Sequence, residues 1–133
     1  MRAQQIYVNV AVNDLEKSKM FFSKLGFEFK PEFTNEHAAC VILSDNIFTM
    51  LLTKPFFKNF IPDRDVADPK KNIQTLMCIN VAKRSDVDEI IKRAVAAGGR
   101  AYHEPQDEGF MYGQAFVDLD GHLWEVMSYE AKV

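Results

Sequence analysis

Apolar and polar residues alternate at the start of the chain. Between residues 6 and 12 the aliphatic residues take one parity, while Tyr7, Asn9 and Ala11 take the other. This alternation is typical of a strand with one face on a core. A helix is predicted next, beginning at a capping Asn13 and ending at Gly26. Three further apolar segments predict strands over residues 27–33, 37–43 and 47–53.

The same order of elements is predicted again in the second half of the chain. A strand over 73–81 is followed by a helix that Ser85 caps and Gly98 ends, and then by strands over 100–104, 110–119 and 122–129. The order βαβββ therefore occurs twice, about half a chain length apart. We predict a single α+β domain over residues 1–133, with unit one at about 1–53, a linker at 54–72 and unit two at about 73–133.

The predicted linker contains an aromatic cluster. Phe56, Phe57, Phe60 and Ile61 would share one side of a short helix. Two interpretations remain open: the cluster packs on the edge of the domain, or it forms a flap over a cavity.

Length and charge narrow the class of protein. The chain has 133 residues, enough for one domain, and a formal net charge of −3 with basic residues spread along it. We therefore expect no nucleic-acid partner. No apolar run is long enough to span a bilayer, so we expect no membrane partner either. Cys40 and Cys78 both fall in predicted strands and are expected to be reduced core residues, which favours a cytoplasmic protein.

Two stretches of sequence carry a family resemblance. The first runs from Tyr7 through Asn13-Asp14-Leu-Glu-Lys-Ser and Phe21-Phe22 to Gly26-Phe27, and the second is Gly113-Gln-Ala-Phe-Val-Asp-Leu-Asp-Gly-His-Leu-Trp-Glu125. They resemble the opening and the end of units in the vicinal oxygen chelate superfamily, which includes glyoxalases, extradiol dioxygenases and bleomycin-resistance proteins. The resemblance spans the chain. It implies a glyoxalase-like fold, in which two βαβββ units form curved mixed sheets around a cavity with the helices outside.

The resemblance also implies positions for a divalent metal. Metal-dependent members place ligands on the first and last strand of each unit, and these positions fall on Tyr7, near Leu51, on Gln74 and on Glu125. Tyr7 is a poor ligand unless its hydroxyl loses its proton, and Leu51 cannot bind metal. A partial site of Gln74 and Glu125 is too small, because catalytic metal sites use about three protein ligands. We therefore predict no cofactor, with a divalent metal as the alternative.

Glu125 is the candidate catalytic residue. Strand alternation puts it on the face opposite Trp124 and Val126, between Leu123 and Met127. A strand glutamate is usually solvated, but the resemblance implies a position in the cavity. A partly desolvated carboxylate there suits proton transfer.

Four other residues join Glu125 as candidate ligand contacts. Tyr7 and Asn9 share one strand face, where Tyr7 either donates a hydrogen bond to a ligand or fills volume. Gln74 is either a cavity residue or a solvated residue at a strand edge. Tyr112 lies in the aromatic segment between Gly109 and Gly113, which either borders a ligand or forms the entry of a hairpin.

Three functions remain open from the sequence. The first is a glyoxalase/bleomycin-resistance-like protein that binds a small molecule in an aromatic-lined cavity without the usual family metal. The alternative is a lyase, isomerase or dioxygenase-type enzyme that uses Glu125 as general base or metal ligand. The third is an interaction protein with a vestigial cavity. A homodimer is expected in each case, because exposed sheet edges favour pairing between chains.

Overall fold

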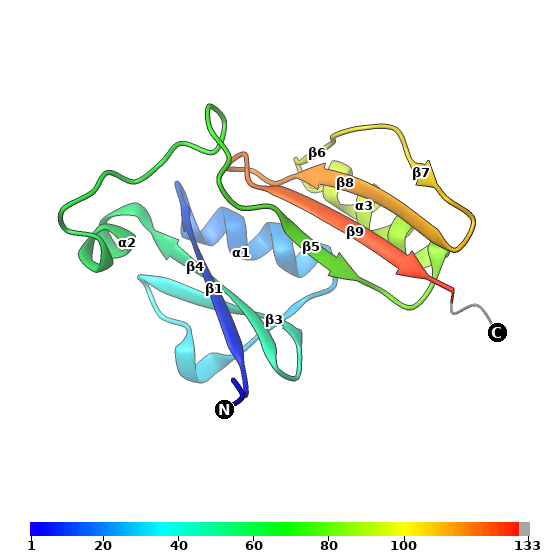
Figure 1. Cartoon of the computed structure of the whole chain (residues 1–133). Coiled ribbons are helices and arrows are strands. Elements are labelled where there is room, and N and C mark those ends of the chain that lie inside the picture. Colours follow the sequence, from blue (N-terminus) through cyan, green and yellow to red (C-terminus); the bar gives the residue numbers. More distant parts are fainter. Residues whose placement is uncertain (131–133) are drawn as a thin grey trace. The chain divides into compact units, whose positions relative to one another are not determined.

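The computed structural model describes residues 1–130. The chain divides into two compact units between Ala67 and Asp68, a point inside the predicted linker (Figure 1). Each unit contains a mixed sheet with an α-helix against one face, so the α+β class is confirmed. Unit 1 has the predicted order βαβββ, and unit 2 has it with one additional short strand, β7, that the sequence did not predict.

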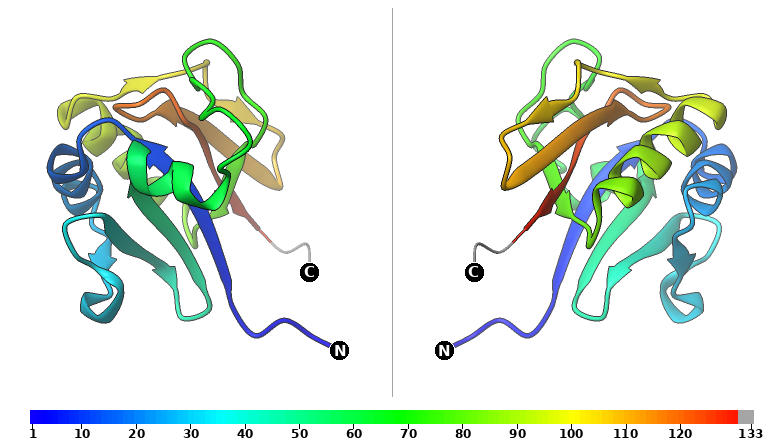
Figure 2. Two further views of the ribbon diagram at one scale, coloured as in Figure 1. Left: turned by 90° about the vertical axis from the view of Figure 1, so that its left-hand side faces the viewer. Right: turned by 90° about the vertical axis from the view of Figure 1, so that its right-hand side faces the viewer.

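Unit 1 is built on a four-stranded sheet in the order β1-β4-β3-β2. The β1/β4 pair is parallel, whereas β4/β3 and β3/β2 are antiparallel. Helix α1 contacts β3 and β4 and lies along one face of this sheet (Figure 2). The elements of unit 1 are β1 (Ile6–Val12), α1 (Leu15–Lys24), β2 (Glu28–Phe29), the 3₁₀ helix η1 (Pro31–Phe33), β3 (Ala38–Ser44), β4 (Ile47–Thr53) and α2 (Lys54–Phe60).

The two faces of the unit 1 sheet follow from the strand register. Val10 and Val12 lie on the face of β1 that carries its aliphatic residues, and Leu51 of β4 lies on the same face of the sheet. These residues are buried, as are Phe21 and Phe22 of α1. The other parity carries Tyr7 and Asn9. The α1 side is therefore the core of unit 1, because apolar residues on both the strands and the helix lose their contact with water there.

Unit 2 repeats this arrangement with a longer connection after its helix. Its sheet has the order β5-β9-β8-β6, with β7 also pairing with β8. The β5/β9 pair is parallel and the β8/β9 pair is antiparallel. Helix α3 contacts β8 and β9 (Figure 2). The elements of unit 2 are β5 (Met77–Asn80), α3 (Arg84–Ala96), β6 (Arg100–Ala101), β7 (Gln106–Asp107), β8 (Met111–Val117) and β9 (Leu123–Tyr129).

Several predicted boundaries need correction at the helix starts and in one short strand. Helix α1 is capped by Asp14, whose side chain accepts a hydrogen bond from the Lys17 backbone N–H, and not by Asn13. The cap of α3 is Lys83, so Ser85 lies inside the helix. The predicted strand over 27–33 ends early because Pro31, which lacks an N–H, begins a 3₁₀ helix.

The predicted strand over 73–81 is wrong in its first half. Strand β5 begins only at Met77, opposite Trp124 of β9. Its parallel partner β9 begins at Leu123, directly after a tight turn. Residues 73–76 therefore have no neighbouring strand with which to pair, although their apolar-polar alternation is strand-like.

Within residues 1–130, no helix is long and apolar enough to cross a membrane.

Candidate functional site

Glu125 lies on the face of the unit 2 sheet that α3 does not cover. In the register it stands opposite Ala115 of β8 and Cys78 of β5. Trp124 and Val126 point to the other face and are fully buried. Glu125 itself is half-buried. The facing predicted from strand alternation therefore holds, and this uncovered face of unit 2 is named here the Glu125 face.

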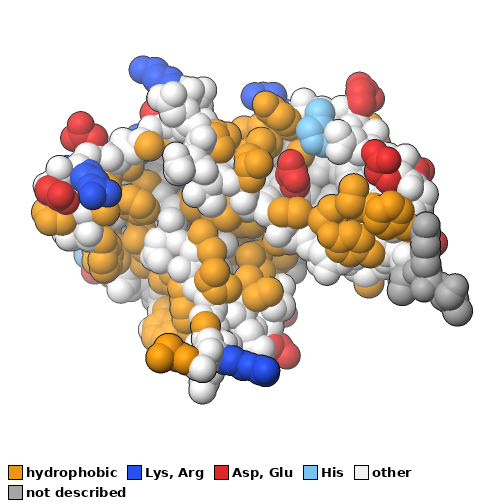
Figure 3. Space-filling model, viewed as in Figure 1, with side chains coloured by type: hydrophobic (Ala, Val, Ile, Leu, Met, Phe, Trp, Pro, Cys, Tyr) orange, Lys and Arg blue, Asp and Glu red, His pale blue; other side chains and the backbone are white. Residues whose placement is uncertain are grey.

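Sulfur atoms border the carboxylate on the Glu125 face. The Cys78 Sγ lies 3.5 Å from the Met127 Sδ. Partial burial raises the pKa of the Cys78 thiol, and the negative charge of Glu125 raises it further. A raised thiol pKa makes Cys78 a weak nucleophile at neutral pH, since the thiolate is the reactive form. Figure 3 shows hydrophobic side chains gathered over the C-terminal part of β9. In that part of the strand Met127 is half-buried and Tyr129 is exposed.

Tyr112 lies on the opposite side of the sheet from Glu125. Its hydroxyl donates a hydrogen bond of 2.5 Å to the Asp88 Oδ1 on α3, and the Gln114 amide donates one of 2.6 Å to the same oxygen. The hydrogen bond to Asp88 raises the pKa of Tyr112. The structure therefore places Tyr112 between sheet and helix, and it does not bring this predicted ligand contact together with Glu125.

A second polar cluster fastens the loop before β8 to the start of α3. The Arg84 guanidinium donates to both carboxylate oxygens of Asp107, at 2.7 and 3.0 Å, and to the Gly109 carbonyl oxygen at 2.7 Å. The hydrogen bonds from Arg84 and from the Gly109 N–H lower the pKa of Asp107. All of these groups have protein partners, which points to a structural role.

Gln74 lies outside the sheet and is exposed. The helix caps show which residue of unit 2 corresponds to Tyr7: Lys83 caps α3 and Asp14 caps α1, an offset of 83 − 14 = 69 residues. Residue 7 + 69 is Leu76. The position assigned to Gln74 by a repeat of half the chain length was therefore two residues too early.

On unit 1, Tyr7 and Asn9 lie on the sheet face that α1 does not cover. The Tyr7 ring stacks on Phe48 with centroids 4.8 Å apart and meets Phe33 edge-on at 6.1 Å. Its hydroxyl donates to the Gln5 side-chain oxygen at 2.8 Å. Asn9 is exposed, and its amide donates to the Tyr7 carbonyl oxygen at 3.2 Å. The ring of Tyr7 therefore fills volume against Phe48 and Phe33, while a hydrogen bond from its hydroxyl to a ligand stays a prediction.

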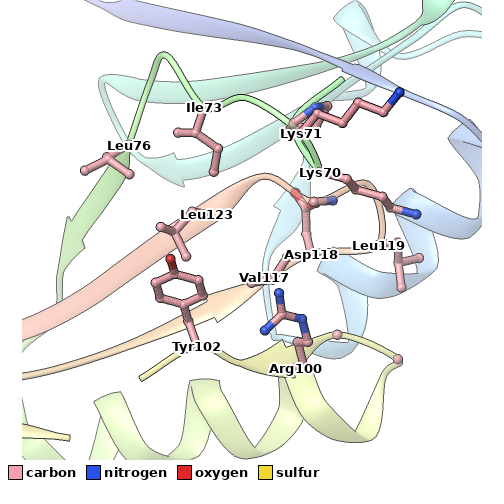
Figure 4. Close-up of a pocket in the computed structure, with 14 residues that line it drawn as sticks. Lys70, Lys71, Ile73, Leu76, Arg100, Tyr102, Val117, Asp118, Leu119 and Leu123 are labelled. Carbon is pink, nitrogen blue, oxygen red and sulfur yellow. The ribbon is translucent and has the colours of Figure 1, made fainter. Parts of the chain in front are cut away.

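The described residues of unit 2 also line an open cleft of about 820 Å³. Ile73 and Leu76 face Tyr102 and Leu123 across it, and Arg100 lies beside Tyr102 (Figure 4). The floor continues toward the Glu125 face, because Leu123 is two residues before Glu125 on the same parity of β9. The fourteen lining residues are Pro69, Lys70, Lys71, Ile73, Leu76, Gly98, Gly99, Arg100, Tyr102, Val117, Asp118, Leu119, Gly121 and Leu123.

One wall of the cleft is the β8–β9 turn, which Asp118 holds closed. The Asp118 Oδ1 accepts hydrogen bonds from the backbone N–H groups of residues 120, 121 and 122 at 3.0–3.1 Å. Its Oδ2 accepts one from the Trp124 indole N–H at 3.1 Å. Burial raises the pKa of Asp118, while the nearby His122 and these hydrogen bonds act to lower it. Both oxygens of the Asp118 carboxylate are therefore occupied by hydrogen bonds that hold the turn closed.

Gly121 lets the linker approach this turn. A Cβ at Gly121 would lie 2.7 Å from the Lys70 Cγ and 3.0 Å from the Lys70 backbone nitrogen. The backbone φ of Gly121 is +102°, a conformation that side chains disfavour. Glycine at this position therefore allows the segment that contains Lys70 and Lys71 to pack closely against the turn.

Residues 4–126 match the family model of the Glyoxalase/Bleomycin resistance protein/Dioxygenase superfamily. The chain belongs to this superfamily. No curated protein matches it.

Several solved structures share the fold of this chain. A hypothetical protein from S. aureus is 25% identical, with a TM-score of 0.80 over 96% of this chain and 95% of that chain. A family enzyme from Burkholderia phytofirmans PsJN is 15% identical, with a TM-score of 0.80 over 96% of this chain and all of that one. The bleomycin resistance determinant encoded on the transposon Tn5 is 18% identical, with a TM-score of 0.67 over 97% and 100% of the two chains.

The side chains at the metal positions of the superfamily do not fit a divalent ion. On β4, Leu51 faces α1 and is fully buried, so the corresponding residue on the open face is Met50. In unit 1 Met50 of β4 pairs with Asn9 of β1, and in unit 2 Glu125 of β9 pairs with Cys78 of β5, so Met50 and Glu125 are at equivalent positions. Tyr7, Met50, Leu76 and Glu125 thus occupy the four positions, and only the last is a ligand for a hard cation. No three His, Cys, Asp or Glu side chains of the described chain gather as a metal site would require.

Sequence reasoning did not find the cleft residues Arg100 and Tyr102. Their signal was present: Gly98-Gly99 follows α3, and Arg100 and Tyr102 have the same parity in the strand predicted over 100–104, which places both side chains on one face. In the structure β6 covers only Arg100 and Ala101, and Tyr102 follows it directly. Lys70 and Lys71 gave no such signal, because their position depends on a linker whose path no periodicity describes.

Proposed function

We propose that this superfamily member binds a small molecule without the usual family metal, and that the unit 2 cleft with the adjoining Glu125 face receives it. The observation that carries the proposal is the cleft. Its volume of about 820 Å³ falls within the range of small-molecule sites, about 300–1,000 Å³. Among the fourteen lining residues Tyr102 is the one aromatic, so the lining is mainly aliphatic and not aromatic as the sequence predicted. This apolar surface offers area for a ligand, while the charged groups at the rim would orient it.

The donor set supports binding without metal. Tyr7, Met50 and Leu76 stand where metal-dependent relatives carry ligands, which leaves Glu125 alone. One carboxylate remains free to accept a hydrogen bond from a ligand. Structural relatives include a bleomycin resistance determinant and a fosfomycin resistance protein from Mesorhizobium loti, so both drugs belong among the first compounds to test.

Thermal unfolding in EDTA tests this proposal. Bleomycin, fosfomycin and the naphthalene compounds 2-naphthoate, 2-naphthyl phosphate, 2-naphthamide and 2-naphthylmethylamine form the panel. A ligand present at 100 times its Kd stabilises by about 2.7 kcal/mol, so a true ligand raises Tm by roughly 8–13 °C. Tyr102→Ala, an exposed substitution in the cleft, should reduce that rise, and Val95→Ala, an exposed position on α3, serves as the control outside the cleft and the Glu125 face. If no panel member raises Tm, or the rise requires an added metal ion, the proposal is wrong.

A second candidate function is proton transfer by Glu125. The observation that favours it is the setting of this half-buried carboxylate, which lies between Leu123 and Met127 on the open face. In such a reaction the carboxylate takes a proton from carbon next to a carbonyl and returns it to the resulting enolate. Thioester and hemithioacetal substrates would reveal turnover. Glu125→Gln should then lower kcat by at least about 100-fold, and an unchanged rate would exclude this role.

A homodimer and a cytoplasmic location remain part of the proposal. Light scattering at tens of micromolar protein measures the oligomeric state, and a monomeric mass would contradict the dimer.

A further inference from the structure

The cleft of unit 2 separates apolar from cationic groups. Ile73, Leu76 and Tyr102 are about half exposed, and they lie toward one end. Lys70 and Lys71 lie toward the other end, and Arg100 lies between them and Tyr102 (Figure 4). A ligand that fills the cleft would therefore meet apolar surface with one part and positive charge with another.

The three cations have no carboxylate partners in the part of the chain that the structure describes. No ion pair joins Lys70, Lys71 or Arg100 to Asp or Glu. Arg100 instead lies over the Tyr102 ring, with Cζ 5.9 Å from the ring centroid. Arg84 shows the contrast, because both of its terminal nitrogens are engaged by Asp107.

Acidic groups near the cleft do not cancel this charge. Asp118 is the single acidic residue among the fourteen that line it, and it is 7% exposed. Its two oxygens already accept four hydrogen bonds from the turn and from Trp124. Glu125 lies further along β9 and does not line the cleft. The exposed Asp68 lies just outside the lining, where its carboxylate accepts a hydrogen bond from the Lys70 backbone N–H at 3.0 Å. Three cations line the cleft against this one carboxylate, so the accessible charge at the rim is positive.

We propose that the cleft binds a small molecule that joins an apolar, ring-sized body to an anionic group, a carboxylate or a phosphate. This inference rests on the proposed function and names its ligand class. The ring would lie between Leu76 and Tyr102, and the anion would meet the Arg100 guanidinium, whose planar fork suits both carboxylate and phosphate. Lys70 and Lys71 add charge from flexible side chains, on a segment that Gly121 holds in place.

Isothermal titration with four matched probes tests the charge preference. The probes are 2-naphthoate, 2-naphthyl phosphate, 2-naphthamide and 2-naphthylmethylamine, which share one ring system and differ in the charged group. Three exposed charge contacts together should favour the anions over the neutral amide by about tenfold at low salt. About 0.5 M NaCl should remove most of this preference, because it screens exposed charges. The ratio of naphthoate to phosphate affinity identifies the preferred anion.

Charge-neutralising variants locate the site. Arg100→Gln and the double variant Lys70→Gln/Lys71→Gln should each weaken anion binding about three- to fivefold, while naphthamide affinity stays within about twofold. Lys92→Gln, an exposed lysine of α3 outside the cleft, is the matched control and should leave all four affinities unchanged.

The outcomes separate this inference from the proposed function. Equal affinity for the amide and the anions, or tightest binding of the amine, overturns the anionic ligand class and leaves small-molecule binding intact. Unchanged anion affinity in Arg100→Gln overturns the placement. If none of the four probes binds while bleomycin or fosfomycin raises Tm, the inference fails and the proposed function stands.

Discussion

Replacing Asp118 should destabilise the protein more than replacing any exposed Asp or Glu residue would. Asp118→Ala removes four hydrogen bonds at once, three from backbone N–H groups and one from the indole of Trp124. The Gly121 N–H keeps a second partner in the Asp118 carbonyl oxygen at 3.3 Å. The indole N–H is fully buried and would lose its acceptor. A buried donor without a partner costs about 1–3 kcal/mol.

The sum of these losses gives the magnitude. The indole and the two remaining N–H groups together predict a loss of about 3–5 kcal/mol in the free energy of unfolding. For a chain of 133 residues this lowers Tm by roughly 10–20 °C. Asp118→Asn keeps the shape and one acceptor oxygen and avoids burying a charge, so its cost should be about 1–3 kcal/mol.

Urea and thermal unfolding followed by circular dichroism measure both variants. Asp45→Asn, at an exposed turn between β3 and β4, is the matched control and should stay within about 0.5 kcal/mol of the parent. If Asp118→Ala melts within about 3 °C of the parent protein, Asp118 does not hold the turn and the reasoning is wrong.

Three further predictions follow from neighbouring contacts. The Arg84 hydrogen bonds lower the pKa of Asp107 below its ordinary 3.8, so the stability they give is present above that pH and is lost as pH falls through the lowered pKa. The Tm difference between the parent protein and Asp107→Asn should therefore shrink on acidification. A Tm difference that is constant from pH 7 to pH 2 would contradict this. Gly121→Ala should cost about 1–3 kcal/mol in urea unfolding and weaken 2-naphthoate binding by displacing Lys70; unchanged values for both would show that the segment does not depend on glycine. Tyr112→Phe should cost about 0.5–1.5 kcal/mol and leave probe affinities unchanged, because its hydroxyl bonds to α3; a changed affinity measured by titration would instead support its role as a ligand contact.

Much of the fold follows from periodicity in the sequence. The predicted strand over 47–53 is observed with the same ends, and α1 ends at Lys24, two residues before Gly26, whose φ is +103°. Local pattern failed where the outcome depended on a distant partner. Ile73 to Leu76 alternate like a strand, yet β9 begins at Leu123 after the turn that Asp118 closes. No local signal reports where a partner strand begins.

The residues of the candidate site also differ in whether local pattern or a distant part of the chain determines their position. The facing of Glu125 could be predicted because parity along a strand needs no knowledge of its partner. The position of Gln74 could not, because assigning it required the exact offset between the two units, which their helix caps reveal. Tyr112 lies on the α3 side because the parity of β8 is set by its register with β9. Lys70 and Lys71 could not be predicted as cleft residues either, because they lie on a linker whose path no periodicity describes.

The most direct test of metal-independent binding in the cleft is an NMR titration of labelled protein with 2-naphthoate in EDTA. The predicted result is saturable shifts of backbone amides around Arg100, Tyr102 and Leu123, unchanged when a divalent ion is added. Shifts that map elsewhere, that do not saturate, or that require the metal would contradict it.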